Sequence, residues 1–160
     1  LNRLTGLDVS DIMFDTRVRL ATPDFLEFEV ERERHRVRRY GGAFTLVRVG
    51  FELSGGTFAL FREWDSAAIV ELSRLLTSTL RPLDLVARLD GQALALFLPE
   101  TDARGVEAVE KRLKALLAEA SLTTREGRPL GVLWDSRSFA GADVQMDDVR
   151  KFLARGEVRE

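Results

Sequence analysis

The chain has 160 residues, of which 45% are hydrophobic and 31% charged, so it is long enough for one domain with a single core. The absence of cysteine and the single histidine, His35, exclude disulfides, cysteine nucleophiles and zinc sites built from thiolates or clustered histidines. A formal net charge of −2 argues against broad binding to nucleic acid. Because the sequence lacks both an apolar run of the roughly 18–20 residues that a membrane span needs and an export leader, we expect a cytoplasmic protein.

The first quarter of the chain predicts one helix and one strand after a weakly patterned start. Residues 1–20 mix apolar and acidic residues, and we interpret them as a linker or signalling helix ahead of a single domain at 21–160. From Pro23 to Gly41-Gly42, apolar residues recur at helical intervals, with glutamates in the first half and arginines in the second. Ala43–Leu53 is almost continuously apolar, which is typical of a central strand covered on both faces.

The middle of the chain predicts a helix followed by a hairpin. Ser66–Leu80 has an apolar stripe at helical spacing, and Pro82 ends it. Two short apolar runs, Leu85–Leu89 and Ala93–Leu98, flank Asp90-Gly91, a pair that suits a tight turn. We therefore expect two antiparallel strands here.

The last third predicts a helix, a strand and a short helix. Thr101-Asp102 is suited to cap a helix that extends to about Ala120, and Pro129–Trp134 has the pattern of a strand. Ser136–Asp147 is small and polar and is predicted to be a loop, and Met146–Arg155 a short helix. The order of elements favours an α/β (α+β) domain with one mixed sheet and helices packed on it.

Two charges lie where the second helix should end and the hairpin begin. Arg81 and Asp84 are three positions apart at this boundary, and both could face a ligand. On spacing alone, a surface ion pair worth about 0–1 kcal/mol is the simpler interpretation.

The residues around this pair form a recognisable frame. Arg81 and Asp84 are followed after five positions by Asp90-Gly91-Gln92-Ala93-Leu94, and the next strand ends in Leu-Pro-Glu-Thr101. This frame resembles the GGDEF (diguanylate cyclase) family, whose pattern is R-x-x-D, five residues, GGDEF and a strand ending in L-P-x-T. The resemblance implies a nucleotidyl-cyclase-like fold with a mainly antiparallel central sheet.

The residues that the family uses for catalysis are absent from this sequence. The signature positions hold Asp90, Gly91, Gln92, Ala93 and Leu94. The family's magnesium-binding Asp-x-Asp falls on Arg48 and Gly50, and arginine has no lone pair for a metal and repels it. We therefore expect no cyclase activity, no bound magnesium and no cofactor.

The family's separate inhibitory site, in contrast, has counterparts here. The resemblance assigns cyclic di-GMP binding to Arg81 and Asp84, with Arg112 as a supporting arginine. Arginine forks suit phosphates and the guanine edge, and a carboxylate suits guanine N–H groups. A second arginine set around Arg34, from a neighbouring subunit, could complete the contacts.

Two functions remain open from the sequence. The first is a degenerate GGDEF domain that acts as a cyclic di-GMP receptor in a larger bacterial signalling protein. The second is a ligand-free domain for dimerisation or protein interaction. In either case the expected partners include other domains of the parent protein and a second copy of the chain, but not nucleic acid, and we expect no membrane span in this segment.

Overall fold

The computed structural model describes residues 14–15, 20–53, 57–59, 66–89, 94–123 and 127–154. The helices are α2 (Pro23–Tyr40), α3 (Ser66–Thr79), α4 (Ala103–Ala120) and α5 (Met146–Leu153). The strands are β1 (Phe14–Asp15), β2 (Leu20–Ala21), β3 (Ala43–Leu53), β4 (Thr57–Ala59), β5 (Leu85–Arg88), β6 (Leu94–Leu98) and β7 (Leu130–Ala140). No described helix is both long and apolar enough to cross a bilayer.

The strands form one mixed sheet with the order β1-β2-β5-β6-β3-β4, and β7 pairs with β3 along its whole length. Only the β2–β5 pair is parallel among the described pairs. The predicted hairpin is present, since β5 and β6 are antiparallel with Leu85 opposite Phe97. The expected mixed and mainly antiparallel sheet is therefore confirmed.

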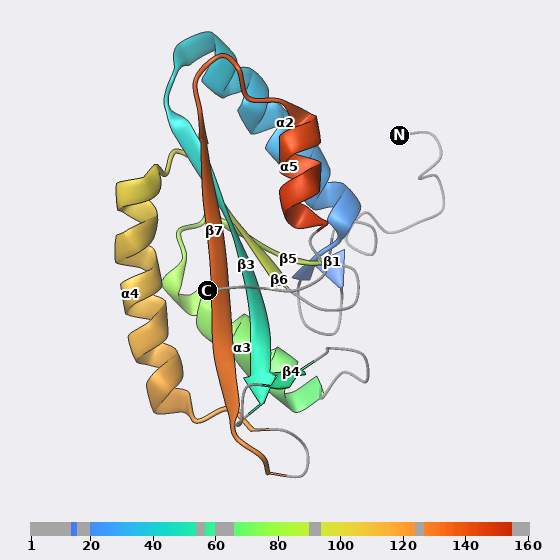
Figure 1. The fold of residues 1–160 in the computed structure, drawn as a ribbon, viewed down its shortest axis with the longest axis vertical. Helices are drawn as coiled ribbons and strands as arrows, with labels where there is room; N and C mark the ends of the chain where they lie inside the picture. Colours follow the sequence, from blue (N-terminus) through green and yellow to red (C-terminus); the bar gives the residue numbers. More distant parts are fainter. Residues whose placement is uncertain are drawn as a thin grey trace.

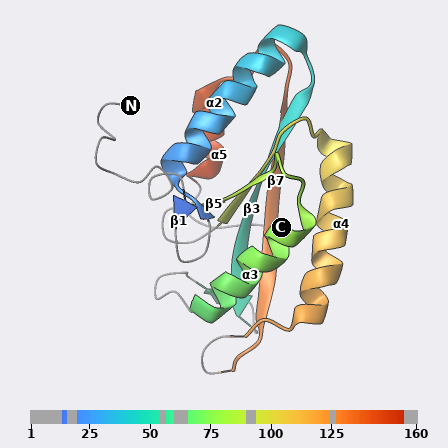
Figure 2. The ribbon, with the colours of Figure 1, turned by 180° about the vertical axis from the view of Figure 1, so that it is seen from behind.

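The helices cover both faces of this sheet. In Figure 1 and Figure 2, α2 and α5 lie side by side at one end of the long β3–β7 pair. One face of the sheet packs on α3 and α4, and the other on α2 and α5. The alternation along β3 produces this division, because Val47 and Val49 join the first core and Phe44 and Leu46 the second.

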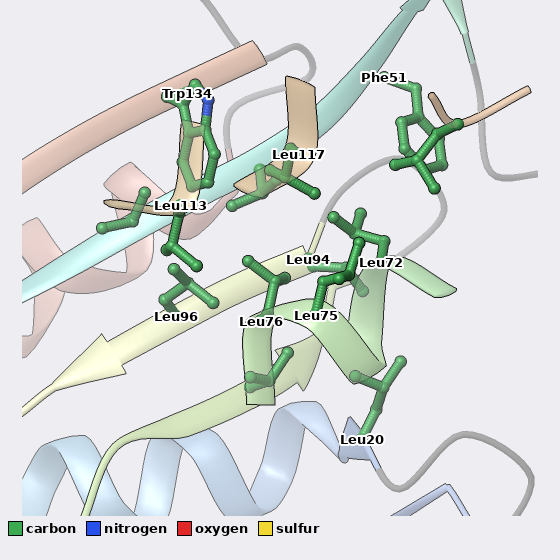
Figure 3. Packing of buried hydrophobic residues seen from close by; sticks show 14 of the residues in the cluster. Leu20, Phe51, Leu72, Leu75, Leu76, Leu94, Leu96, Leu113, Leu117 and Trp134 are labelled. Atoms are coloured by element: carbon green, nitrogen blue, oxygen red, sulfur yellow. The ribbon is translucent and has the colours of Figure 1, made fainter. Parts of the chain in front are cut away.

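The core under α3 and α4 is built from leucines around one tryptophan. Figure 3 shows Trp134 of β7 close to Leu113 and Leu117 of α4, with Leu76 of α3 and Leu96 of β6 nearby. This packing fixes α3 and α4 on the sheet. It therefore fixes the end of α3 and the start of α4, the two points where the sequence places its candidate residues.

Local chemistry explains where α2 and α4 begin. The Thr22 side chain accepts a hydrogen bond from the backbone N–H of Phe25, and Pro23 occupies the first turn. Asp102 caps α4 in the same way by accepting from Gly105. Gly41 ends α2 with a φ of 81°, a conformation that glycine adopts without strain.

The strand predicted at Pro129–Trp134 is longer than the sequence indicated. β7 continues to Ala140, so the prediction of a loop from Ser136 was wrong for residues 136–140. The pattern misled because Ser136 and Arg137 are polar and exposed, on a strand that among the described strands pairs only with β3. Pairing with β3 provides the strand's hydrogen bonds without requiring apolar side chains there.

The expectations for the N-terminus and the signature turn lie largely outside the described residues. Of the predicted linker or helix at 1–20, the structure describes Phe14–Asp15 as a two-residue strand and Leu20 as the start of β2. Residues 90–93 of the signature are also outside the described part, whereas Leu94 is fully buried in β6.

Helix α5 packs on β7 through an aromatic contact among others, which gives a first prediction. The ring of Phe152, 1% exposed, packs edge-on against Phe139 of β7 with 6.5 Å between the ring centroids. Phe152→Ala should lower the free energy of unfolding by about 3–5 kcal/mol through the cavity that it leaves. The neighbouring exposed Lys151→Ala should change it by less than about 0.5 kcal/mol. Urea unfolding measures both, and equal effects would contradict the packing described.

Candidate functional site

A cleft of about 770 Å³ opens where the end of α3, the β6–α4 turn, the first turns of α4 and the end of α2 meet. Its lining includes Arg81, Asp84 and Arg112, so the structure brings together the three residues that the sequence singled out. Four cations and three carboxylates line it: Arg36, Arg81, Lys111 and Arg112, with Asp84, Glu100 and Asp102. The cleft therefore carries one more positive than negative ionisable group.

Arg81 and Asp84 form a hydrogen-bonded ion pair immediately before β5 begins. Asp84 accepts hydrogen bonds from the Arg81 backbone N–H at 2.8 Å, from Nη2 at 2.9 Å and from Nε at 3.3 Å. The Asp84 side chain is only 2% exposed, whereas that of Arg81 is 50% exposed. In this arrangement the carboxylate holds the arginine in place and presents little of its own surface to the cleft.

Arg81 also binds the turn between β6 and α4. Its Nη2 donates to the Pro99 carbonyl at 2.6 Å and to the Thr101 hydroxyl at 3.0 Å. Thr101 is itself fixed, since its carbonyl accepts from the Thr45 hydroxyl of β3 at 2.8 Å. Hydrogen bonding to Asp84 raises the pKa of Arg81 above its usual value, burial opposes the rise, and the charges of Asp84 and Glu100 add to it. The guanidinium is therefore charged at every physiological pH.

The α4 wall of the cleft supplies cations without partners. Arg112 and Lys111 are exposed, and within the described ranges neither forms an ion pair or a side-chain hydrogen bond. Their charges are thus available to an anion that enters the cleft. The sequence identified Arg112, but it did not identify Lys111, which the structure places one position away on the same wall.

The α2 wall contributes Arg36, one of the arginines that the sequence places in the second half of this helix. Arg36 donates from Nε and Nη2 to the two carboxylate oxygens of Glu33, at 2.7 and 2.9 Å. This hydrogen bonding raises the pKa of Arg36 despite partial burial, and the charges of Glu33 and Glu100 add to the rise. A glutamate and an arginine three apart on a helix were visible in the sequence, but not the cleft that Arg36 lines.

Arg34, suggested as part of a second arginine set, lies elsewhere. It donates to the carboxylate of Glu31 on its own helix and, at 3.4 Å, to the Val144 carbonyl ahead of α5. It does not line the cleft. Two residues apart on a helix are about 200° apart around its axis, so Arg34 and Arg36 point to different sides.

The two positions that the family resemblance assigns to metal ligands are buried in β3. Arg48 is 1% exposed on β3, and its Nη1 lies 3.9 Å from the Asp135 carboxylate of β7. Gly50 is also buried on β3. Within the described ranges no three histidine, cysteine or acidic side chains gather as a metal site would require.

Comparison with known proteins gives a consistent assignment. Residues 66–132 match the family described as "Diguanylate cyclase, GGDEF domain", which is less than half of the chain. No curated protein matches the chain.

Solved structures match most of the chain. The diguanylate cyclase SiaD of Pseudomonas aeruginosa, in complex with its activator SiaC, is 18% identical, with a TM-score of 0.69 over 94% of this chain and 59% of its own. PelD from the same organism, in complex with c-di-GMP, is 26% identical, with a TM-score of 0.56 over 82% of this chain and 44% of its own. The coiled-coil and GGDEF portion of DgcB from Caulobacter crescentus, also with c-di-GMP, is 14% identical, with a TM-score of 0.71 over 95% of this chain and 81% of its own.

The chain thus spans about half the length of the SiaD and PelD structures that it matches. The sequence match extends from α3 to the start of β7. The described sheet and helices α2 to α5 have the architecture of the family. The chain therefore has the fold of GGDEF domains, and its residues 66–132 match that family in sequence.

Proposed function

We propose that this chain is a receptor for cyclic di-GMP that binds the dinucleotide in the cleft and does not synthesise it. The observation that carries the proposal is the convergence of Arg81, Asp84 and Arg112 on one cleft of about 770 Å³. That volume lies within the range of about 300–1,000 Å³ typical of small-molecule sites.

The chemistry of the cleft fits a ligand with phosphates and guanines. Arg112 is exposed and has its whole guanidinium free for a phosphate or for the O6/N7 edge of guanine. Arg81 is half-exposed and is held in one orientation by Asp84, which reduces the entropy that it loses on binding. Asp84 is a positioning residue in this arrangement, because its carboxylate is occupied by Arg81.

The similar structures support the same ligand class. The structures of PelD and DgcB are both complexes with c-di-GMP, and PelD is 26% identical to this chain over 82% of this chain's length. What those proteins bind is a reason to test this chain with the same dinucleotide.

The proposal that the chain does not synthesise cyclic di-GMP rests on a residue of β3. A cyclase needs carboxylates to hold Mg²⁺ against the phosphates of GTP. At the position of the family's first metal ligand, Arg48 is buried within 3.9 Å of Asp135, so it places a fixed positive charge where a cation would have to bind.

The alternative, a domain that has kept these residues only for structure, has one observation in its favour. Arg81 already joins the end of α3, the start of β5 and the β6–α4 turn through its bonds to Asp84, Pro99 and Thr101. In that case the Arg81 side chain would contribute to the stability of the fold, and replacing the unpaired Arg112 would change neither stability nor ligand binding. Binding of cyclic di-GMP by the wild-type chain therefore separates the two functions, and Arg112 tests whether that binding occurs in this cleft.

Arg112→Ala should weaken cyclic di-GMP binding by about 1.5–3 kcal/mol, because it removes charge-assisted bonds to the ligand. The free energy of unfolding should change by less than about 0.5 kcal/mol, since Arg112 is exposed and unpaired in the described structure. Calorimetric titration and urea unfolding measure the two quantities.

Lys114→Ala is the matched control, since Lys114 is also exposed on α4 but does not line the cleft. Equal measurable affinities for wild type, Arg112→Ala and Lys114→Ala would remove Arg112 from the site, whereas no binding by any of the three folded proteins would favour the structural alternative.

Arg81→Ala should affect both properties. Binding should fall by about 2–4 kcal/mol through loss of a charged contact. The free energy of unfolding should fall by about 1–3 kcal/mol, because the Asp84 carboxylate loses its guanidinium donors and the Pro99 carbonyl loses one of its donors.

Arg74→Ala controls for the loss of an arginine–carboxylate pair at the same spacing, since Arg74 binds Glu71 on the exposed face of α3 and is outside the cleft. Wild-type affinity in a folded Arg81→Ala variant would remove Arg81 from the site.

Incubation of the chain with GTP and either Mg²⁺ or Mn²⁺ should yield no cyclic di-GMP, because the metal position on β3 carries Arg48. Chromatography of the nucleotide products checks this, with an active diguanylate cyclase run in parallel as a positive control. Product that accumulates in proportion to the concentration of this chain would refute the receptor-only function.

A further inference from the structure

Arg36 and Glu100 meet at the α2 side of the cleft, and the proposed site uses neither. Arg36 belongs to α2 and Glu100 to the turn between β6 and α4, and both line the cleft. The Arg36 Nη1 atom lies 3.8 Å from the Glu100 carboxylate, which is close enough for an ion pair but too far for a hydrogen bond.

Arg36 is already oriented for an anion. The Nε and Nη2 atoms of its guanidinium are bound by Glu33, whose carboxylate is 8% exposed and cannot easily move away. A guanidinium has five N–H donors, so binding through one edge leaves donors at Nη1. Arg36 therefore presents its remaining edge with little further loss of freedom.

Glu100 is held by its backbone and not by its carboxylate. Its N–H donates to Glu33 at 3.1 Å, and its φ of 53° lies in the left-handed region that glutamate rarely adopts. The side chain is 59% exposed and has no hydrogen bond within the described residues. The turn thus places a carboxylate beside Arg36, while the side chain can still swing into solvent.

The charge of Glu100 opposes the proposed ligand. It acts on Arg36 and also on Arg81, whose pKa it helps to raise. A phosphodiester that approached Arg36 would meet this carboxylate first. It would have to displace the carboxylate or bind beside a like charge, and either outcome weakens binding.

We propose that Arg36 is a phosphate-binding residue of the cleft and that the Glu100 carboxylate occupies its anion position until the ligand displaces it. The inference rests on the proposed function, because it assigns the phosphodiester of cyclic di-GMP to this wall of the same cleft. Glu33 is the positioning residue for both groups, since it binds the guanidinium of Arg36 and the backbone N–H of Glu100.

The test compares Glu100→Gln with Glu107→Gln by calorimetric titration with cyclic di-GMP. Both substitutions remove one negative charge from an exposed position, but Glu107 lies on α4 and does not line the cleft. Glu100→Gln should tighten binding about three- to tenfold, as expected for removing one nearby partly screened charge. Glu107→Gln should leave the affinity within about twofold of wild type at the same ionic strength.

A double-mutant cycle with Arg36→Met then tests the assigned contact. Arg36→Met should weaken binding about ten- to a hundredfold, and Glu100→Gln should tighten binding less in that background than in the wild type. If Arg36→Met does not fold, Arg36→Lys replaces it, because lysine can pair with Glu33 but has no second edge for a phosphate.

The outcomes separate this inference from the function on which it rests. If wild type binds and Glu100→Gln binds no more tightly than Glu107→Gln, the inference is overturned and the receptor function stands. If wild type gives no heat but Glu100→Gln binds, the inference is supported and wild-type receptor function fails. Flat titrations of both folded proteins overturn both.

Discussion

The hydrogen bonds of Arg81 join three elements that the sheet alone would leave separate. Through Asp84 they fix the turn that leads from α3 into β5, and through Pro99 and Thr101 they fix the turn that leads from β6 into α4. Thr101 is in turn tied to β3 by Thr45. The shape of the cleft depends on this junction, because its floor and one wall are these same turns.

Two of the cations that line the cleft are paired with carboxylates, and two are unpaired among the described residues and available to a ligand. Arg81 and Arg36 each have one edge bound by a carboxylate that is largely buried, Asp84 in one case and Glu33 in the other. Arg112 and its neighbour Lys111 are exposed and unpaired in the described structure. Arg81 and Arg36 are thus held in place before a ligand arrives, and Arg112 and Lys111 are free to complete the contact. Holding donors in place lowers the entropic cost of binding an anion.

Much of the fold could be predicted from the sequence, because its signals were local. The bounds of α2 follow from Pro23 and Gly41, and those of β3 from a continuous apolar run. The second half of β7 could not be predicted, because a polar strand at the edge of a sheet looks like a loop until its partner is known. The convergence of Arg81, Asp84 and Arg112 was anticipated only through a family resemblance. Spacing alone does not reveal side-chain directions. These directions decide that the Asp84 carboxylate is bound by Arg81, and that Arg36 rather than Arg34 faces the cleft.

The central claim is that this cleft is a selective receptor site, and a calorimetric titration of the wild-type chain tests it most directly. Cyclic di-GMP is titrated beside GTP and cyclic di-AMP at one ionic strength, with the fold checked by circular dichroism. We predict micromolar or tighter binding of cyclic di-GMP and at least tenfold weaker binding of the other two nucleotides, about 1.4 kcal/mol. A folded protein that releases no heat with cyclic di-GMP, or that binds all three nucleotides equally, would contradict the claim.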